Sequence, residues 1–187
     1  MTKRFLFLII FSVFAQGSIA VGQVKPWLLD KTLISRLSPA QTIAGFKIRP
    51  PKGYVFHRNH GPDKTMLCSW AGDMRSDGTR PSIMMEIVSV PKDDFRTAKQ
   101  VLDAFLQRLG KSHRNFKRTS TESGSINGIR FVRARWSRSE TEMSWRGFFY
   151  LAIINGKGVQ LSSQERESHQ DALRVAEASA LTFRKLP

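Results

Sequence analysis

Two turns rich in asparagine and glycine divide the second half of the chain into four strands, and this pattern restricts the possible folds more than any other feature. Both residues of Asn127-Gly128 tolerate positive φ, as a two-residue hairpin turn requires. The segment 155–158 (Asn-Gly-Lys-Gly) supplies a second turn. Residues 132–136 alternate strictly between apolar and basic side chains, and the runs that flank the turns are predicted strands. They are Thr119–Ser125, Ile129–Arg138, Ser144–Ile154 and Val159–Ser163. Two successive hairpins predict an antiparallel sheet.

Further strands are predicted before residue 91, at Phe46–Ile48, Tyr54–His57, Lys64–Ala71 and Ser82–Val90. The last of them is largely apolar at successive positions, and Glu86 is its only charged residue. A strand with this composition is typical of a sheet that is covered on both faces.

Two segments have helical periodicity. Thr97 and Gln100 have the spacing of a capping box, an apolar stripe follows, and Gly110 stands where the helix is expected to end. A second helix is predicted to start at Ser168 and to run to Phe183. The order strands, helix, strands, helix predicts an α+β fold, an antiparallel β-sheet with helices packed on it.

The N-terminus has the layout of a secretory signal peptide. Two basic residues, an apolar run at Phe5–Ala15 and small residues at Ser18 and Ala20 follow one another. Since a span of the bilayer needs about 20 apolar residues, the run is too short for a membrane anchor. We therefore divide the chain into a signal peptide (1–20), an N-terminal arm (21–43) and a single α+β domain (44–187). The arm is either a short amphipathic helix over Trp27–Leu37 or an extended segment.

Charge and cysteine content narrow the class of protein. The 187 residues include 30 Lys and Arg against 15 Asp and Glu, a net charge of +15, which falls to +13 once Lys3 and Arg4 leave with the signal peptide. A single cysteine excludes an intrachain disulfide framework and a multi-cysteine metal site. Cys68 lies between apolar neighbours, which favours a buried thiol over a reactive one.

Three local strings resemble the PsbP-like superfamily, which includes DcrB-like bacterial proteins. They are Phe46–Tyr54, the hairpin string Gly124–Gly128 and the closing string Glu177–Phe183, and the resemblance spans about residues 44–184. It implies a small extracytoplasmic α-β-α sandwich domain with an accessory or binding role. No metal-site motif of that superfamily maps onto this chain, so the resemblance carries over only fold and compartment.

Signals for catalysis are weak. The sequence has no Gly-x-Ser-x-Gly motif, and we expect no catalytic residue, metal or cofactor. His57 and His60 form a His-x-x-His pair, but the segment reads as strand end and loop, where this spacing does not bring both rings to one face. Glu86 is expected to be partly buried and to pair with Arg133 or Arg135 rather than act as an acid.

Basic residues form two candidate binding sites for an anionic partner. Alternation along the hairpin strands places arginines beside aromatic rings on one sheet face, which suits bidentate hydrogen bonds and stacking. This first set is Arg133, Arg135 and Arg146 with Phe131, Phe148 and Tyr150. The second set follows the first helix and contains Lys111, Arg114, Lys117 and Arg118. A solvated basic surface without a ligand explains both sets equally well.

These observations predict an exported, periplasmic or extracellular, non-catalytic accessory or binding domain. Its partner would be an anionic polymer, a lipid headgroup or an acidic protein, and nucleic acid is not expected because exported proteins rarely meet it. One alternative is an enzyme acting on an anionic envelope substrate, with Glu86 or His57 and His60 in a pocket beside the arginines. Another is a structural subunit that docks through Trp27–Leu37.

Overall fold

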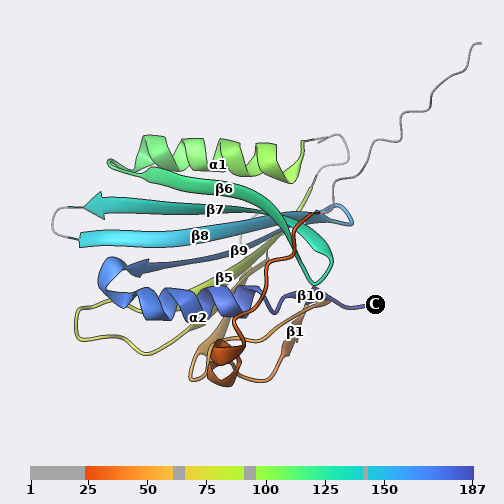
Figure 1. Cartoon of the computed structure of the whole chain (residues 1–187), viewed down its shortest axis with the longest axis horizontal. Helices are drawn as coiled ribbons and strands as arrows, with labels where there is room; N and C mark the ends of the chain where they lie inside the picture. The colour runs from red at the N-terminus through yellow and green to blue at the C-terminus, as the bar shows by residue number, and fades with distance from the viewer. Residues whose placement is uncertain (1–23, 61–65, 91–95, 141–142) are drawn as a thin grey trace, which may run out of the picture.

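A seven-stranded antiparallel sheet forms the centre of the molecule in the computed structural model (Figure 1). The structure describes residues 24–60, 66–90, 96–140 and 143–187, so the predicted signal peptide (1–20) lies outside the described residues. In spatial order the strands are β3 (Val55–His60), β4 (Met66–Ala71), β5 (Ser82–Ser89), β9 (Lys157–Arg166), β8 (Met143–Ile154), β7 (Ile129–Glu140) and β6 (Lys117–Ile126).

Both predicted hairpins are present, and their turns have the expected backbone. Asn127 and Gly128 have φ values of 47° and 80°, and Asn155 and Gly156 have 51° and 69°. The second turn is shorter than predicted, because β9 already begins at Lys157 and pairs there with Ile154. Positive φ at both central residues matches the right-handed twist of the flanking strands.

One helix covers each face of the sheet, so the fold is the predicted α-β-α sandwich (Figure 1). Helix α1 (Ala98–Ser112) buries Leu102 and Leu106 against β7 and β8. Helix α2 (Gln170–Ala180), preceded by the short 3-10 helix η3 (Glu167–His169), packs Ala176 and Ala180 on the opposite face. The sheet separates two hydrophobic cores, and the larger lies on the α2 side and includes Cys68, which is buried as predicted.

The predicted start of α1 is confirmed, but the helix ends later than predicted. Thr97 Oγ1 accepts a hydrogen bond from the backbone N–H of Gln100, and the Gln100 side chain accepts one from the Thr97 N–H. Gly110 does not end the helix, which continues to Ser112 and is capped at His113. The stripe that packs on the sheet ends at Leu109, so the last turn projects beyond the core.

A second, three-stranded sheet brings the C-terminal strand together with two strands near the start of the domain. Strand β2 (Phe46–Ile48) lies between β1 (Gln41–Ile43) and β10 (Arg184–Lys185). The predicted boundary after residue 43 therefore falls inside the hairpin formed by β1 and β2. Ile43 is buried in the main core, so this end of the arm is part of the domain.

The rest of the described arm is also packed on the domain. The backbone N–H of Trp27 donates to the carbonyl of Ser125 (2.9 Å), which extends the sheet beyond edge strand β6. The segment then passes α2 and forms a 3-10 helix, η1 (Lys31–Arg36), where the sequence allowed an α-helix or an extended arm (Figure 1). Leu33 and Leu37 are buried against α2, which leaves them unavailable to a partner subunit.

Strand β5 is fully covered on only one face, whereas its sequence predicted cover on both faces. Ile83, Met85 and Ile87 are buried, but Met84, Glu86 and Val88 on the other face are only half-buried. The reason is that α1 packs on β7 and β8 and not on β5. In the described ranges no helix is long and apolar enough to cross a membrane.

Candidate functional site

The first predicted basic set does come together on one sheet face, but α2 covers it. Arg135 donates to both carboxylate oxygens of Glu177 in α2 at 2.8 Å, and Arg133 donates to Oε1 of the same residue at 3.1 Å. Glu122 of β6 accepts a second hydrogen bond from Arg133 at 2.8 Å. An anionic ligand on this face would have to compete with Glu177 for both guanidinium groups.

The aromatic members of that set are buried. Phe148 is 2% exposed and Tyr150 is fully buried, so the prediction that they form an open stacking face is wrong. The Tyr150 hydroxyl donates to Glu177 at 2.7 Å, and its ring meets the Trp27 indole edge-on. Burial raises the pKa of Tyr150 well above its ordinary value. Arg146 is half-exposed and pairs with Glu167.

The second predicted set lies at the exposed end of α1. Lys111, Arg114 and Lys117 are exposed, and none has an ion pair within the described part of the chain. Arg118 differs, because it pairs with Asp103 of α1 at 2.6 Å. Arg108 is a further exposed arginine without an ion pair in the same described part. We call Arg108, Lys111, Arg114 and Lys117 the basic end of α1.

Glu86 does not pair with Arg133 or Arg135. It projects on the α1 side of the sheet, whereas the arginines project on the α2 side from β7, which β9 and β8 separate from β5. Glu86 instead lines a groove of about 430 Å³ between α1 and the uncovered face of β5. Arg108 lines the same groove, so the groove opens beside the basic end of α1.

The histidine pair lies in edge strand β3, which runs from Val55 to His60. His57 is exposed, and the His60 side chain lies outside what the structure describes. Among the described residues, no group of three or more His, Cys, Asp and Glu side chains is placed to hold a metal ion.

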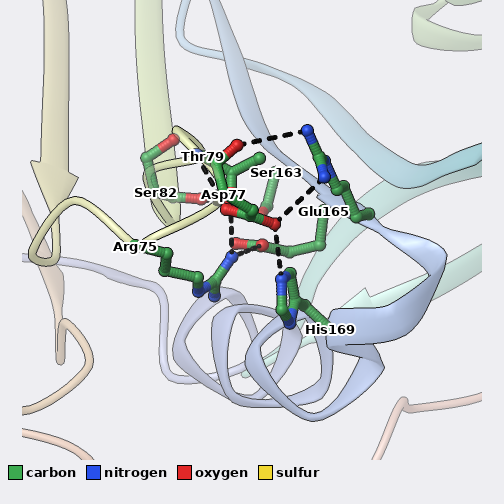
Figure 2. Close-up of polar contacts among 8 residues, drawn as sticks. Arg75, Asp77, Thr79, Ser82, Ser163, Glu165 and His169 are labelled. Carbon is green, nitrogen blue, oxygen red and sulfur yellow. Dashed lines mark hydrogen bonds and ion pairs between the residues drawn. The ribbon is translucent and has the colours of Figure 1, made fainter. Parts of the chain in front are cut away.

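A buried polar cluster beneath the loop between β4 and β5 is the feature that the sequence prediction missed (Figure 2). Glu165 of β9 is 2% exposed and accepts a hydrogen bond from Arg75 at 2.6 Å. Asp77 accepts hydrogen bonds from the backbone N–H and the hydroxyl of Thr79, at 2.9 and 2.6 Å. His169 lies 3.0 Å from the other oxygen of Asp77. The Asp-x-Thr spacing predicts the turn at residues 77–79 but not its partners in β9 and η3.

The charged contacts of this cluster hold the loop between β4 and β5 against β9 and η3. Burial raises the pKa of the Glu165 carboxyl, and the Arg75 guanidinium opposes that shift. Hydrogen bonds from Thr79 and His169 hold the pKa of Asp77 well below its usual range. Ser163 has a hydroxyl of the type a nucleophile needs, but it donates to the carbonyl of Ser82 at 2.7 Å and is buried. The cluster therefore joins the loop to β9 and η3 and offers no activated nucleophile.

Comparison with solved structures gives matches that cover most of this chain at low sequence identity. Cyanobacterial PsbP (CyanoP) from Synechocystis sp. PCC 6803 aligns with a TM-score of 0.56 at 14% identity, covering 92% of this chain and 98% of that one. This chain has the PsbP-like fold. The likeness confirms the α+β sandwich and supports the resemblance found in the three sequence strings.

Two further structures share this PsbP-like fold. LpqN, involved in cell envelope biogenesis of Mycobacterium tuberculosis, aligns with a TM-score of 0.52 at 12% identity, covering 72% of this chain and 84% of that one. The Ran-binding protein Mog1p of Saccharomyces cerevisiae gives 0.52 at 10% identity, with 80% and 96% covered. No protein-family model and no curated protein sequence matches this chain. At these identities the likeness establishes the fold alone.

Proposed function

We propose that this protein is an exported, non-catalytic accessory or binding domain that holds an anionic partner on the basic end of α1. The observation that carries the proposal is the contrast between the two basic sets. Arg133, Arg135 and Arg146 are paired with carboxylates of the same chain, whereas Lys111, Arg114 and Lys117 have none in the described part. Exposed, uncompensated cations attract anions over about one Debye length.

Part of this charge has a local structural role, and part does not. Lys111 lies in the last turn of α1, where a cation stabilises the negative end of the helix. Arg114 and Lys117 follow the helix and are not needed for that purpose. They are the residues of the set that most favour an external partner.

Export is supported by the signal-peptide pattern of residues 1–20 and by the envelope role of one protein with the same fold, LpqN. A binding role is in keeping with Mog1p, which is described as Ran-binding. For this chain, an anionic envelope polymer, a lipid headgroup or an acidic protein would fit the basic end of α1.

A salt titration with a charge-matched pair of variants tests the proposal. In the test variant Lys111, Arg114 and Lys117 become glutamine, and in the control variant the exposed residues Lys52, Arg184 and Lys185 become glutamine. Both variants lose three positive charges. We expect the test variant to bind inorganic polyphosphate and anionic vesicles about 3-fold to about 150-fold more weakly at low salt, because each of the three exposed ion pairs contributes roughly 0.2–1 kcal/mol.

The control variant should lose much less, because its charges lie away from α1. Binding by the unmodified protein should weaken as salt rises, since ions screen exposed charges. Equal losses in the two variants would mean that net charge alone attracts the anion. No binding to any polyanion at low salt would overturn the proposal.

A further inference from the structure

The groove beside α1 has an apolar wall formed by the helix and a floor formed by one face of the sheet, where apolar and polar side chains mix. Val101, Phe105 and Leu109 of α1 form one wall, and Val88 and Leu151 contribute from the sheet. The volume of about 430 Å³ lies within the range of roughly 300–1,000 Å³ that is typical of small-molecule sites. Apolar walls with a few convergent polar groups are the usual composition of such sites.

Two polar side chains lie next to each other on the floor. Glu86 of β5 and Gln160 of β9 are directly opposite in the strand register, and both line the groove. Directly opposed residues hold their Cβ atoms about 5 Å apart on one face. Both side chains are half-buried, and neither has a hydrogen-bond partner within the described part of the chain. A carboxylate and an amide with free capacity can accept and donate several hydrogen bonds to one ligand.

The groove also separates two kinds of charge. Arg108 lines it from α1, next to the exposed cations Lys111 and Arg114, while Glu86 lies on the floor. A ligand that is anionic throughout, such as inorganic phosphate, would be attracted by Arg108 and repelled by Glu86. The site therefore suits a ligand with an anionic group at the α1 end and uncharged hydrogen-bond donors at the floor.

We propose that this groove binds one or two sugar units of an acidic glycan. The hydroxyl groups of the sugar would donate to Glu86 and exchange hydrogen bonds with Gln160, and its C–H face would contact Phe105 and Leu109. Its carboxylate or sulfate would lie against Arg108, and the neighbouring acidic units would follow the basic end of α1. The inference rests on the proposed function, because it names the class of anion that the basic surface holds.

The test compares an acidic glycan with polyanions that are not sugars. The probes are an oligogalacturonate, inorganic polyphosphate, poly-glutamate and phosphatidylglycerol vesicles, each titrated into the unmodified protein and into Glu86→Ala and Gln160→Ala variants. The control variant is Gln164→Ala, which changes the same strand on the same face at a residue that does not line the groove. Amide chemical shifts, followed by NMR in the same titrations, locate the bound probe and report whether each variant is folded.

We expect the oligogalacturonate to shift the amides of Glu86, Gln160 and Arg108. Each groove variant should weaken its binding about tenfold, because a half-buried hydrogen-bond partner of the sugar is lost, and Gln164→Ala should have no effect. Polyphosphate should bind the Glu86→Ala variant as well as or better than the unmodified protein. Glycan binding that is unchanged in both groove variants would overturn the inference, even if salt-dependent polyanion binding at α1 supports the proposed function. Stronger binding of poly-glutamate or vesicles, lost in the groove variants, would also overturn it and assign the groove to a peptide or a lipid.

Discussion

Glu177 is the residue on which the charged contacts beneath α2 converge. It accepts hydrogen bonds from Arg133, Arg135 and the Tyr150 hydroxyl, and its own side chain is 15% exposed. The Arg133 side chain is 12% exposed and also lies over the Trp27 ring, 4.8 Å from its centroid. One carboxylate therefore compensates both the largely buried Arg133 and the half-exposed Arg135.

Replacing Glu177 by alanine tests that role. We expect the free energy of unfolding to fall by about 3 kcal/mol, because Arg133 stays largely buried and, among the described residues, keeps only the half-exposed Glu122 as a carboxylate partner beside the Tyr150 hydroxyl. The matched control is Glu167→Ala, whose pair with Arg146 is half-exposed on both sides and should contribute about 1 kcal/mol or less. Urea unfolding of both variants measures the difference, and similar losses would contradict the assignment.

At the scale of elements, α1 has the best-defined local sequence signal. Its capping box forms as the spacing of Thr97 and Gln100 predicts, since both contacts lie within four residues. The position of α1 on the sheet depends instead on tertiary packing. Because α1 packs on β7 and β8 and not on β5, a groove lined by Glu86 lies between the helix and β5.

The capping box at the start of α1 leads to a prediction about stability. Thr97→Ala should lower the free energy of unfolding by about 1 kcal/mol, because the N–H of Gln100 loses its acceptor. Gln107→Ala, at an exposed position within the same helix, should change stability by about 0.5 kcal/mol or less. Circular dichroism during thermal unfolding measures both variants, and an unaltered Thr97→Ala protein would show that tertiary packing alone holds the helix start.

At the scale of the whole molecule, charge is distributed unevenly. Within the described ranges, Glu177 of α2 and Glu167 of η3 compensate Arg133, Arg135 and Arg146 on the α2 side of the sheet. The basic end of α1, on the other side, has no such compensation within those ranges. A net charge of +15 therefore overstates the surface that is available to an anionic partner.

The two tyrosines determine how the stability of the whole protein changes at alkaline pH. Burial raises the pKa of Tyr54 to about 12 and raises that of Tyr150 as well. Because these pKa values lie above the unfolded value of about 10, the stability they contribute is complete below about pH 10 and is lost as the pH rises through the folded values. We expect the urea midpoint to fall between about pH 10 and about pH 12, with tyrosinate absorbance appearing as the protein unfolds.

A Tyr54→Phe/Tyr150→Phe variant is the control for that titration. It removes both ionising phenols, so its urea midpoint should depend less on pH in this range. Tyrosinate formation near pH 10 in a protein that is still folded would show that the hydroxyls are accessible to solvent, which would contradict the burial of Tyr150.

Local sequence patterns were enough to predict both Asn-Gly turns, the capping box of α1, the alternation of the hairpin strands and hence the α+β sandwich. These features depend on residues a few positions apart, and therefore short-range geometry specifies them. Long-range packing, in contrast, sets which faces of the sheet the helices cover. It placed Phe148 and Tyr150 beneath α2, supplied Glu177 as partner to Arg133 and Arg135, left Glu86 in a groove and tied Asp77 to His169. Contacts of this kind join residues that are tens of positions apart, and no local pattern encodes which cations will find a carboxylate and which will stay free.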